Sequence, residues 1–98
     1  MTNYIAIIED GGETRATGVW FPDLPGCFSA GDSLDKAMLN GAEALALWSE
    51  VLAEDNRHMP KPRTLAEIKA DPVWADDIAQ YMVAIIPLAL PPAQAAAE

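Results

Sequence analysis

Basic residues are scarce in this chain of 98 residues, in which six Lys and Arg stand against fifteen Asp and Glu, for a formal net charge of −9. A surface that binds nucleic acid needs Lys and Arg to displace the counterions of the phosphates. The composition therefore argues against direct binding to DNA or RNA. The same charge favours a basic partner, whose approach it would accelerate, although acidity can also do no more than keep a small protein in solution.

Cysteine, histidine and long apolar runs are equally limited. The single cysteine, Cys27, excludes an intramolecular disulfide and suits a reducing cytosol, so we expect a cytoplasmic protein. The lone histidine, His58, lies in a proline-flanked loop without partners at zinc-site spacing, and we expect no metal or other cofactor. No signal peptide is visible, and no run approaches the roughly 20 apolar residues that span a bilayer.

What is present is enough for one domain. The chain is 51% hydrophobic, well above the level of a disordered sequence, and its length suits a single core. We expect that domain over residues 1–90 and a flexible tail rich in Ala and Pro over residues 91–98. Because no Lys or Arg follows Lys69, we predict no C-terminal DNA-binding domain.

The chain is organised around a corner at residues 22–26, between a strand that ends at Phe21 and a short strand over residues 27–30. Proline at the start of the corner ends the first strand because it has no N–H for the ladder. Pro25 and Gly26 suit a type II turn, in which the glycine takes a positive φ. The tip of such a turn is expected to be exposed.

The periodicity of apolar residues predicts an α+β domain. The expected strands and helices, in chain order, are strands 4–9, 14–21 and 27–30, helices 33–55 and 65–70, and strand 80–88. Asp32 or Ser33 is expected to cap the long helix, and Thr64 with Glu67 a capping box on the short one. Asp76 and Asp77 suggest a solvated turn, and Gly18 a bulge or a close approach by another backbone.

The first three strands are expected to form an antiparallel meander, with the fourth beside strand one in the order 3-2-1-4. A strand that follows a helical crossover usually lies parallel to its neighbour. We therefore expect strand four to run parallel to strand one, with the helices over one face of the sheet.

Candidate contact residues lie on the long helix, at the corner and on the last strand. The helix has an apolar stripe and an opposite, acidic side that would suit a basic partner. The strand edges lack the lysines that discourage pairing, so we expect a homodimer or higher oligomer. The candidates for partner binding are Glu43, Leu47, Glu50, Glu54, Asp23 and Leu24, and those for self-association are Leu39 and Met82.

The run WFPDLPGCFSAGDSLDKAMLNGAEAL, residues 20–45, resembles the signature of HicB-like antitoxin domains. That family has an aromatic-Phe/Tyr-Pro-Asp-Leu-Pro-Gly-Cys corner, a Gly-Asp-Ser/Thr helix start and Ala-x-x-Asn-Ala/Gly-x-Glu-Ala in the helix. The resemblance extends from Tyr4 to about Leu88 and implies a partial ribonuclease-H-like fold. It also implies a non-enzymatic antitoxin that binds and occludes HicA, a small basic mRNA interferase. Such antitoxins usually continue into an operator-binding segment that this sequence lacks, as a solitary member or a shortened sequence would.

Two alternatives stay open. An orphan HicB-like domain would act as an oligomeric binding or scaffold module without a toxin. A metal-dependent nuclease would need carboxylates on adjacent strands and a helix, but the centre of the first strand has none. The remaining acids, Glu9, Asp10 and Glu43, lie at a turn and on the polar side of the helix, so we predict that the protein is not an enzyme.

Overall fold

The structure, a computed structural model, describes residues 2–89 as four strands and three helices. In chain order they are β1 (Asn3–Glu9), β2 (Thr17–Trp20), β3 (Phe28–Gly31), α1 (Leu34–Glu54), α2 (Leu65–Ala70), α3 (Ala75–Gln80) and β4 (Met82–Pro87). The predicted tail at residues 91–98 lies outside the described residues.

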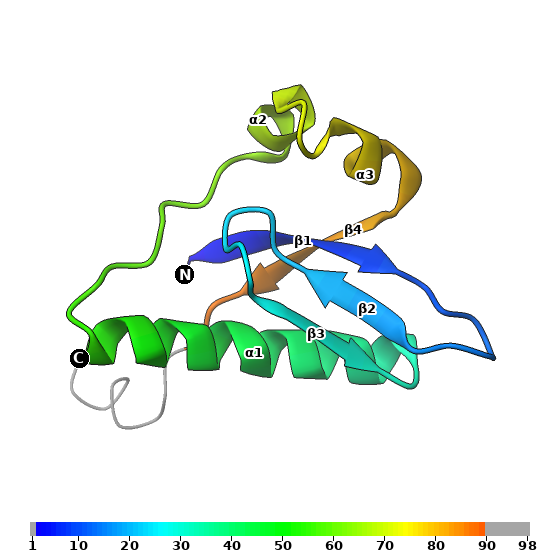
Figure 1. Cartoon of the computed structure of the whole chain (residues 1–98), viewed down its shortest axis with the longest axis horizontal. Coiled ribbons are helices and arrows are strands. Elements are labelled where there is room, and N and C mark those ends of the chain that lie inside the picture. The colour runs from blue at the N-terminus through cyan, green and yellow to red at the C-terminus, as the bar shows by residue number, and fades with distance from the viewer. Residues whose placement is uncertain (1, 90–98) are drawn as a thin grey trace.

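The four strands form one sheet in the order β3-β2-β1-β4, which confirms the predicted order and the α+β class. Every neighbouring pair is antiparallel, including β1 with β4, so the expected parallel fourth strand is wrong. The chain explains why: α1 runs back along the sheet, and the segment with α2 and α3 then returns along it before β4 begins (Figure 1). After two passes instead of one, β4 enters from the opposite end.

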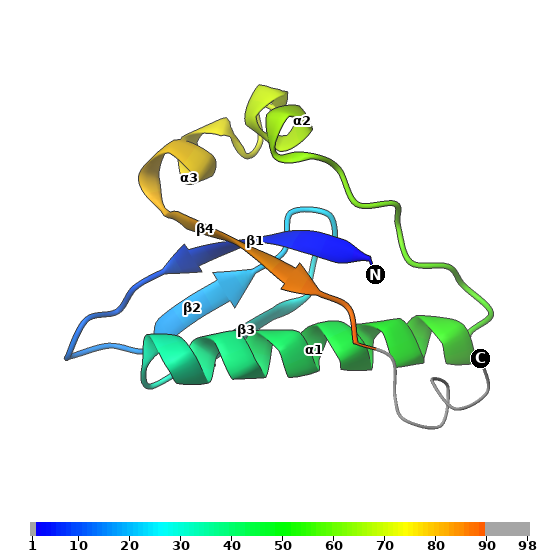
Figure 2. The ribbon, with the colours of Figure 1, turned by 180° about the vertical axis from the view of Figure 1, so that it is seen from behind.

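Helices cover both faces of the sheet, so the expectation of one covered face is also wrong. Side chains alternate between the two faces along β1, where five consecutive residues are buried. Tyr4, Ala6 and Ile8 belong to the cluster under α1. Ile5 and Ile7 belong to a second cluster with Ile68 of α2 and Ile78 of α3. The second layer of helices is visible across the sheet from α1 in Figure 2.

α1 is placed by its cap and by small residues on its inner stripe. The Ser33 side chain accepts a hydrogen bond from the Lys36 N–H, so Ser33 rather than Asp32 caps the helix. Gly31 lies so close to the first turn that an added Cβ would meet the Ala37 nitrogen at 2.4 Å. The buried residues of the helix are Ala37, Gly41, Leu45 and Leu52, as the apolar stripe predicts.

The sequence predicted one of the two short helices and not the other. The α2 capping box is confirmed, because Thr64 and Glu67 exchange hydrogen bonds between side chain and backbone. The expected solvated turn at Asp76 and Asp77 is wrong, because both lie in the first turn of α3, where acids favour the helix dipole.

Gly18 lies in neither a bulge nor a close approach. The register runs through it without interruption on both sides, and a Cβ there would meet nothing within 4 Å. That prediction is wrong; close approaches of other backbone occur instead at Gly11, in the hairpin, and at Gly31, where the chain enters α1.

Candidate functional site

The corner between β2 and β3 folds as its sequence predicts. Gly26 has φ +95°, and the Cys27 N–H donates to the Leu24 carbonyl at 2.9 Å across Pro25 and Gly26. This is the arrangement of a type II turn with proline second and glycine third. The Phe21 N–H in turn donates to the Cys27 carbonyl at 3.3 Å and closes the corner.

Asp23 and Leu24 point inward, so the expectation that the corner exposes them is wrong. Leu24 is 1% exposed and packs in the cluster under α1. The Asp23 side chain is 5% exposed and accepts two hydrogen bonds from Arg63, at 2.6 Å from Nε and 2.8 Å from the backbone N–H. Both side chains therefore stabilise the corner from within.

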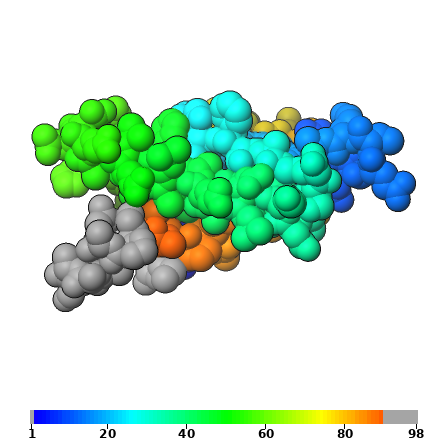
Figure 3. All heavy atoms as spheres, turned by 90° about the horizontal axis from the view of Figure 1, so that it is seen from below, coloured from blue at the N-terminus to red at the C-terminus, as the bar shows by residue number. Residues whose placement is uncertain are grey.

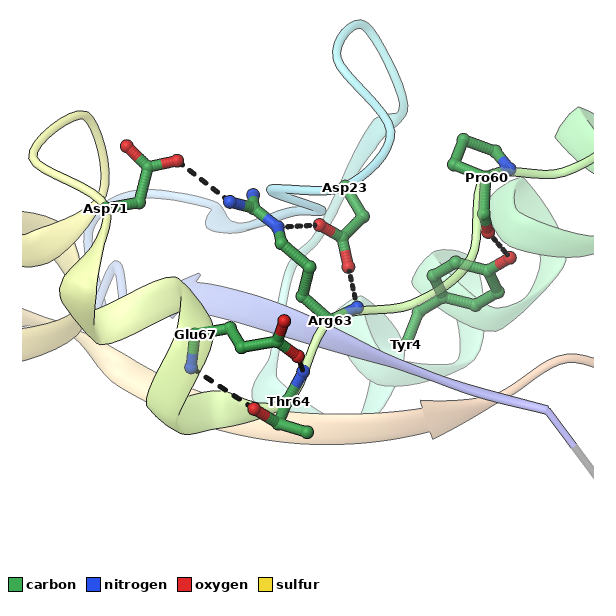
Figure 4. Close-up of polar contacts among 7 residues, drawn as sticks. All are labelled: Tyr4, Asp23, Pro60, Arg63, Thr64, Glu67 and Asp71. Carbon is green, nitrogen blue, oxygen red and sulfur yellow. Dashed lines mark hydrogen bonds and ion pairs between the residues drawn. The ribbon is translucent and has the colours of Figure 1, made fainter.

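Arg63 ties three distant segments together (Figure 4). Besides Asp23, its guanidinium pairs through Nη1 with Asp71, just after α2, at 2.8 Å. The hydrogen bonds that Arg63 donates to Asp71 and Asp23 raise the pKa of Arg63, and the same bond to Asp71 lowers the pKa of that carboxyl. Earlier in the same segment, the Tyr4 hydroxyl donates to the Pro60 carbonyl at 2.6 Å. We call the ion pairs of Arg63 with Asp23 and Asp71 the Arg63 latch; they hold the return segment against the corner.

The outer side of α1 carries the remaining partner-binding candidates. Leu47 is 60% exposed, Glu43 and Glu54 are exposed, and Glu50 is half-buried. Spacings of four, three and four residues keep these side chains on one side of a helix of 3.6 residues per turn. The spheres of α1, in green, cross the face of the molecule seen in Figure 3.

An apolar hollow of about 310 Å³ adjoins Leu47, between α1 and the start of β3. Its floor includes Trp48 and Cys27, whose thiol has a pKa raised to about 11 by burial. Phe28 and Val51 also line it and are 72% and 49% exposed. Sequence reasoning missed this hollow because its walls come from α1 and from the chain around the start of β3, which are separated in sequence. Together with the four helix residues, we call this region the acidic-rimmed hollow.

The self-association candidates lie at the other edge of the sheet. Leu39, 65% exposed, lines a groove between α1 and β4. Met82 opens β4, pairs with Ile8 in the sheet and is 44% exposed.

The acidic residues that remained as candidates for a nuclease lie in separate parts of the fold. Asp10 accepts hydrogen bonds from the Gly12 N–H and the Thr17 hydroxyl within the β1–β2 hairpin, and Glu43 lies on α1. Across residues 2–89, no three His, Cys, Asp or Glu side chains are grouped so that they could hold a metal ion. Within the same residues, none of the helices has the length and apolarity to cross a membrane.

Comparison with known proteins gives one family. Residues 4–96 match the family described as the HicB-like antitoxin of bacterial toxin–antitoxin systems. The chain is 44% identical over 57 residues to an uncharacterized 14.9 kDa protein in the rep-hol intergenic region of Haemophilus phage HP1; the match covers 58% of this chain and 43% of that protein.

Solved structures agree in fold. The antitoxin HicB of Burkholderia pseudomallei is 26% identical with a TM-score of 0.72, over 89% of this chain and 63% of that one. A chain of a toxin–antitoxin complex from Streptococcus pneumoniae is 23% identical with a TM-score of 0.66, over 87% of this chain and 67% of that one. This chain thus spans less than two thirds of the phage relative and of the Burkholderia antitoxin.

Proposed function

Because this chain belongs to the HicB-like antitoxin family of bacterial toxin–antitoxin systems, we propose that it is a non-enzymatic antitoxin that binds and occludes a small, basic, HicA-like mRNA interferase. The observation that carries the proposal is the acidic-rimmed hollow, an exposed apolar site beside Leu47 with three glutamates along the adjoining side of the same helix. The proposed place of action is the bacterial cytoplasm, which the buried free thiol of Cys27 suits.

Charge supports a basic partner at this site. An RNA-cleaving toxin must present cationic groups to the phosphates of its substrate. Glu43, Glu50 and Glu54 offer carboxylates that would take the place of those phosphates. A chain with a net charge of −9 also accelerates the encounter with a cationic protein.

The hollow supplies what charge alone does not. Interfaces draw most of their affinity from a few anchors that fill desolvated pockets, while charges at the rim act mainly on the association rate. Leu47 and Phe28 stand exposed at the hollow, and Trp48 forms part of its floor. We propose that one apolar side chain of the toxin inserts here, with the glutamates at the rim.

The test is to express any small basic protein encoded next to this chain and to measure its association and dissociation rates. Leu47→Asp should raise the dissociation rate by about 30-fold, the equivalent of about 2 kcal/mol for a hot spot. Val73→Asp is the matched control, because Val73 is 73% exposed and lies in the turn between α2 and α3. Equal dissociation rates for the two variants would contradict the placement of the anchor.

Charge reversal tests the rim separately. Changing Glu43, Glu50 and Glu54 to Lys should slow association and weaken its salt dependence. The control reverses three acids at the other end of the sheet, Glu9, Glu13 and Asp76, so that the net charge changes equally. If both triple variants associate at the same rate, only net charge matters and the rim has no specific role.

The corner variant Asp23→Ala with Leu24→Ala is no control for this surface, because both side chains are buried and the change would destabilise the domain. If no neighbouring basic protein binds, the alternative of an oligomeric scaffold without a toxin is favoured.

We further propose that this chain alone neither binds duplex DNA at physiological salt nor cleaves nucleic acid. Salt-sensitive DNA binding, or cleavage lost on changing Glu9, Asp10 or Glu43 to Ala, would contradict this.

A further inference from the structure

β4 is an edge strand of unusual composition. It pairs with β1 along one side over six residue pairs, from Met82↔Ile8 to Pro87↔Asn3, and no strand of the described chain pairs with its other side. Its sequence, Met-Val-Ala-Ile-Ile-Pro, contains no charged residue. Ile85 is 64% exposed and Met82 is 44% exposed. Natural edge strands that stay unpaired usually carry lysine, proline, an inward charge or a bulge, and of these β4 has a proline alone, Pro87 at its last position.

A groove of about 390 Å³ runs beside this edge, between β4 and α1. Met38, Leu39 and Ala42 of the helix line one wall, at the three- and four-residue spacing of a single helix face. Ile85 and Ile86 line the other wall. The free strand edge and the apolar groove are therefore one continuous surface, which we call the β4 face.

Charge decides which partner fits this face. Among the acids of residues 2–89, Asp35 is the one that lines the groove. A basic partner would find little electrostatic attraction at this face. It would find more at the acidic-rimmed hollow beside β3, at the opposite edge of the sheet. A second copy of the chain is repelled wherever acids gather, and at the β4 face one acid, Asp35, lines the groove.

We propose that two copies of this chain associate through the β4 face, with their β4 strands antiparallel about a two-fold axis. Each strand then supplies backbone N–H and C=O groups to the other, and the two sheets become one continuous sheet. Such an arrangement is isologous and closes as a dimer. It places Leu39, Met82 and Ile85 of each copy in the contact and leaves the acidic-rimmed hollow of both copies open.

The test compares one substitution at two places on α1. Leu39→Lys and Leu47→Lys change side chains of similar exposure, 65% and 60%, on the same helix, and each reduces the net negative charge equally. Sedimentation velocity should give a dimer for the wild type and for Leu47→Lys. The dimer of Leu39→Lys should dissociate at concentrations about 100-fold higher than the wild type does, because the interface would bury two unpaired ammonium groups, one from each copy. Ile85→Lys should behave as Leu39→Lys does.

Hydrogen exchange on the wild type tests the strand pairing without any substitution. Outward-facing amides of β4 should exchange more slowly at high micromolar than at low micromolar concentration, while those of the β1–β2 hairpin should not change. A wild-type monomer at high micromolar concentration would overturn the proposal. A dimer that both Leu39→Lys and Ile85→Lys leave intact would also overturn it. The same holds if the exchange rates of the β4 amides do not depend on protein concentration.

Discussion

Loss of the Arg63 side chain should destabilise the domain far more than its position in a loop suggests. In Arg63→Met, the Asp23 carboxylate, which is 5% exposed in the wild type, loses the 2.6 Å contact with Nε. Removing one partner of a fully buried ion pair costs about 3–5 kcal/mol, whereas an exposed pair is worth about 1 kcal/mol or less. The Arg63 side chain is 33% exposed, and Asp23 keeps the backbone N–H of residue 63 at 2.8 Å. We therefore expect an intermediate loss of about 2 kcal/mol.

Urea unfolding followed by tryptophan fluorescence measures this loss. For a domain of this size, about 2 kcal/mol corresponds to a fall in Tm of roughly 10 °C. Lys61→Met is the matched control, since Lys61 is an exposed cation two residues earlier in the same segment. Asp23→Asn added to Arg63→Met should recover part of the loss, because it removes the unpaired charge. A loss for Arg63→Met no larger than that for Lys61→Met, or no recovery in the double variant, would refute the reasoning.

Three further predictions concern acid stability, thiol reactivity and a close approach. Asp71 has a pKa lowered below its ordinary 3.8 by Arg63, so its stabilisation is complete above that value and is lost as the pH falls through the lowered pKa. The stability difference between wild type and Asp71→Asn should accordingly be present at pH 7 and vanish in strong acid, as urea titrations at both pH values would reveal. Cys27, with a pKa of about 11 and 3% exposure, should resist iodoacetamide at pH 8 until urea unfolds the domain. Gly31→Ala should cost about 2 kcal/mol in the same assay, because its Cβ meets backbone, whereas Gly18→Ala should be neutral or slightly stabilising.

The local elements could be predicted from the sequence because their signals lie within a few residues. Pro25 and Gly26 specify a type II turn by their own backbone preferences, and Thr64 and Glu67 specify the capping box by their spacing. The exposure of Leu47 followed from its place on the polar side of an amphipathic helix. The sheet order also agreed with the prediction, as did the fold family that the corner and helix motifs indicated.

Only the tertiary structure decided how distant segments meet. The direction of β4 depends on how often the chain passes along the sheet before β4 begins. The return pass includes the helix α3, which the sequence did not predict because Asp76 and Asp77 suggested a solvated turn. Asp23 and Leu24 were predicted to be exposed at the tip of a turn. They are buried by Arg63 and by α1, which are remote from them in the sequence. The hollow beside Leu47 and the groove beside β4 exist only where α1 meets the two sheet edges. A periodic pattern determines which side of one element is apolar, but which apolar side remains uncovered depends on every other element in the fold.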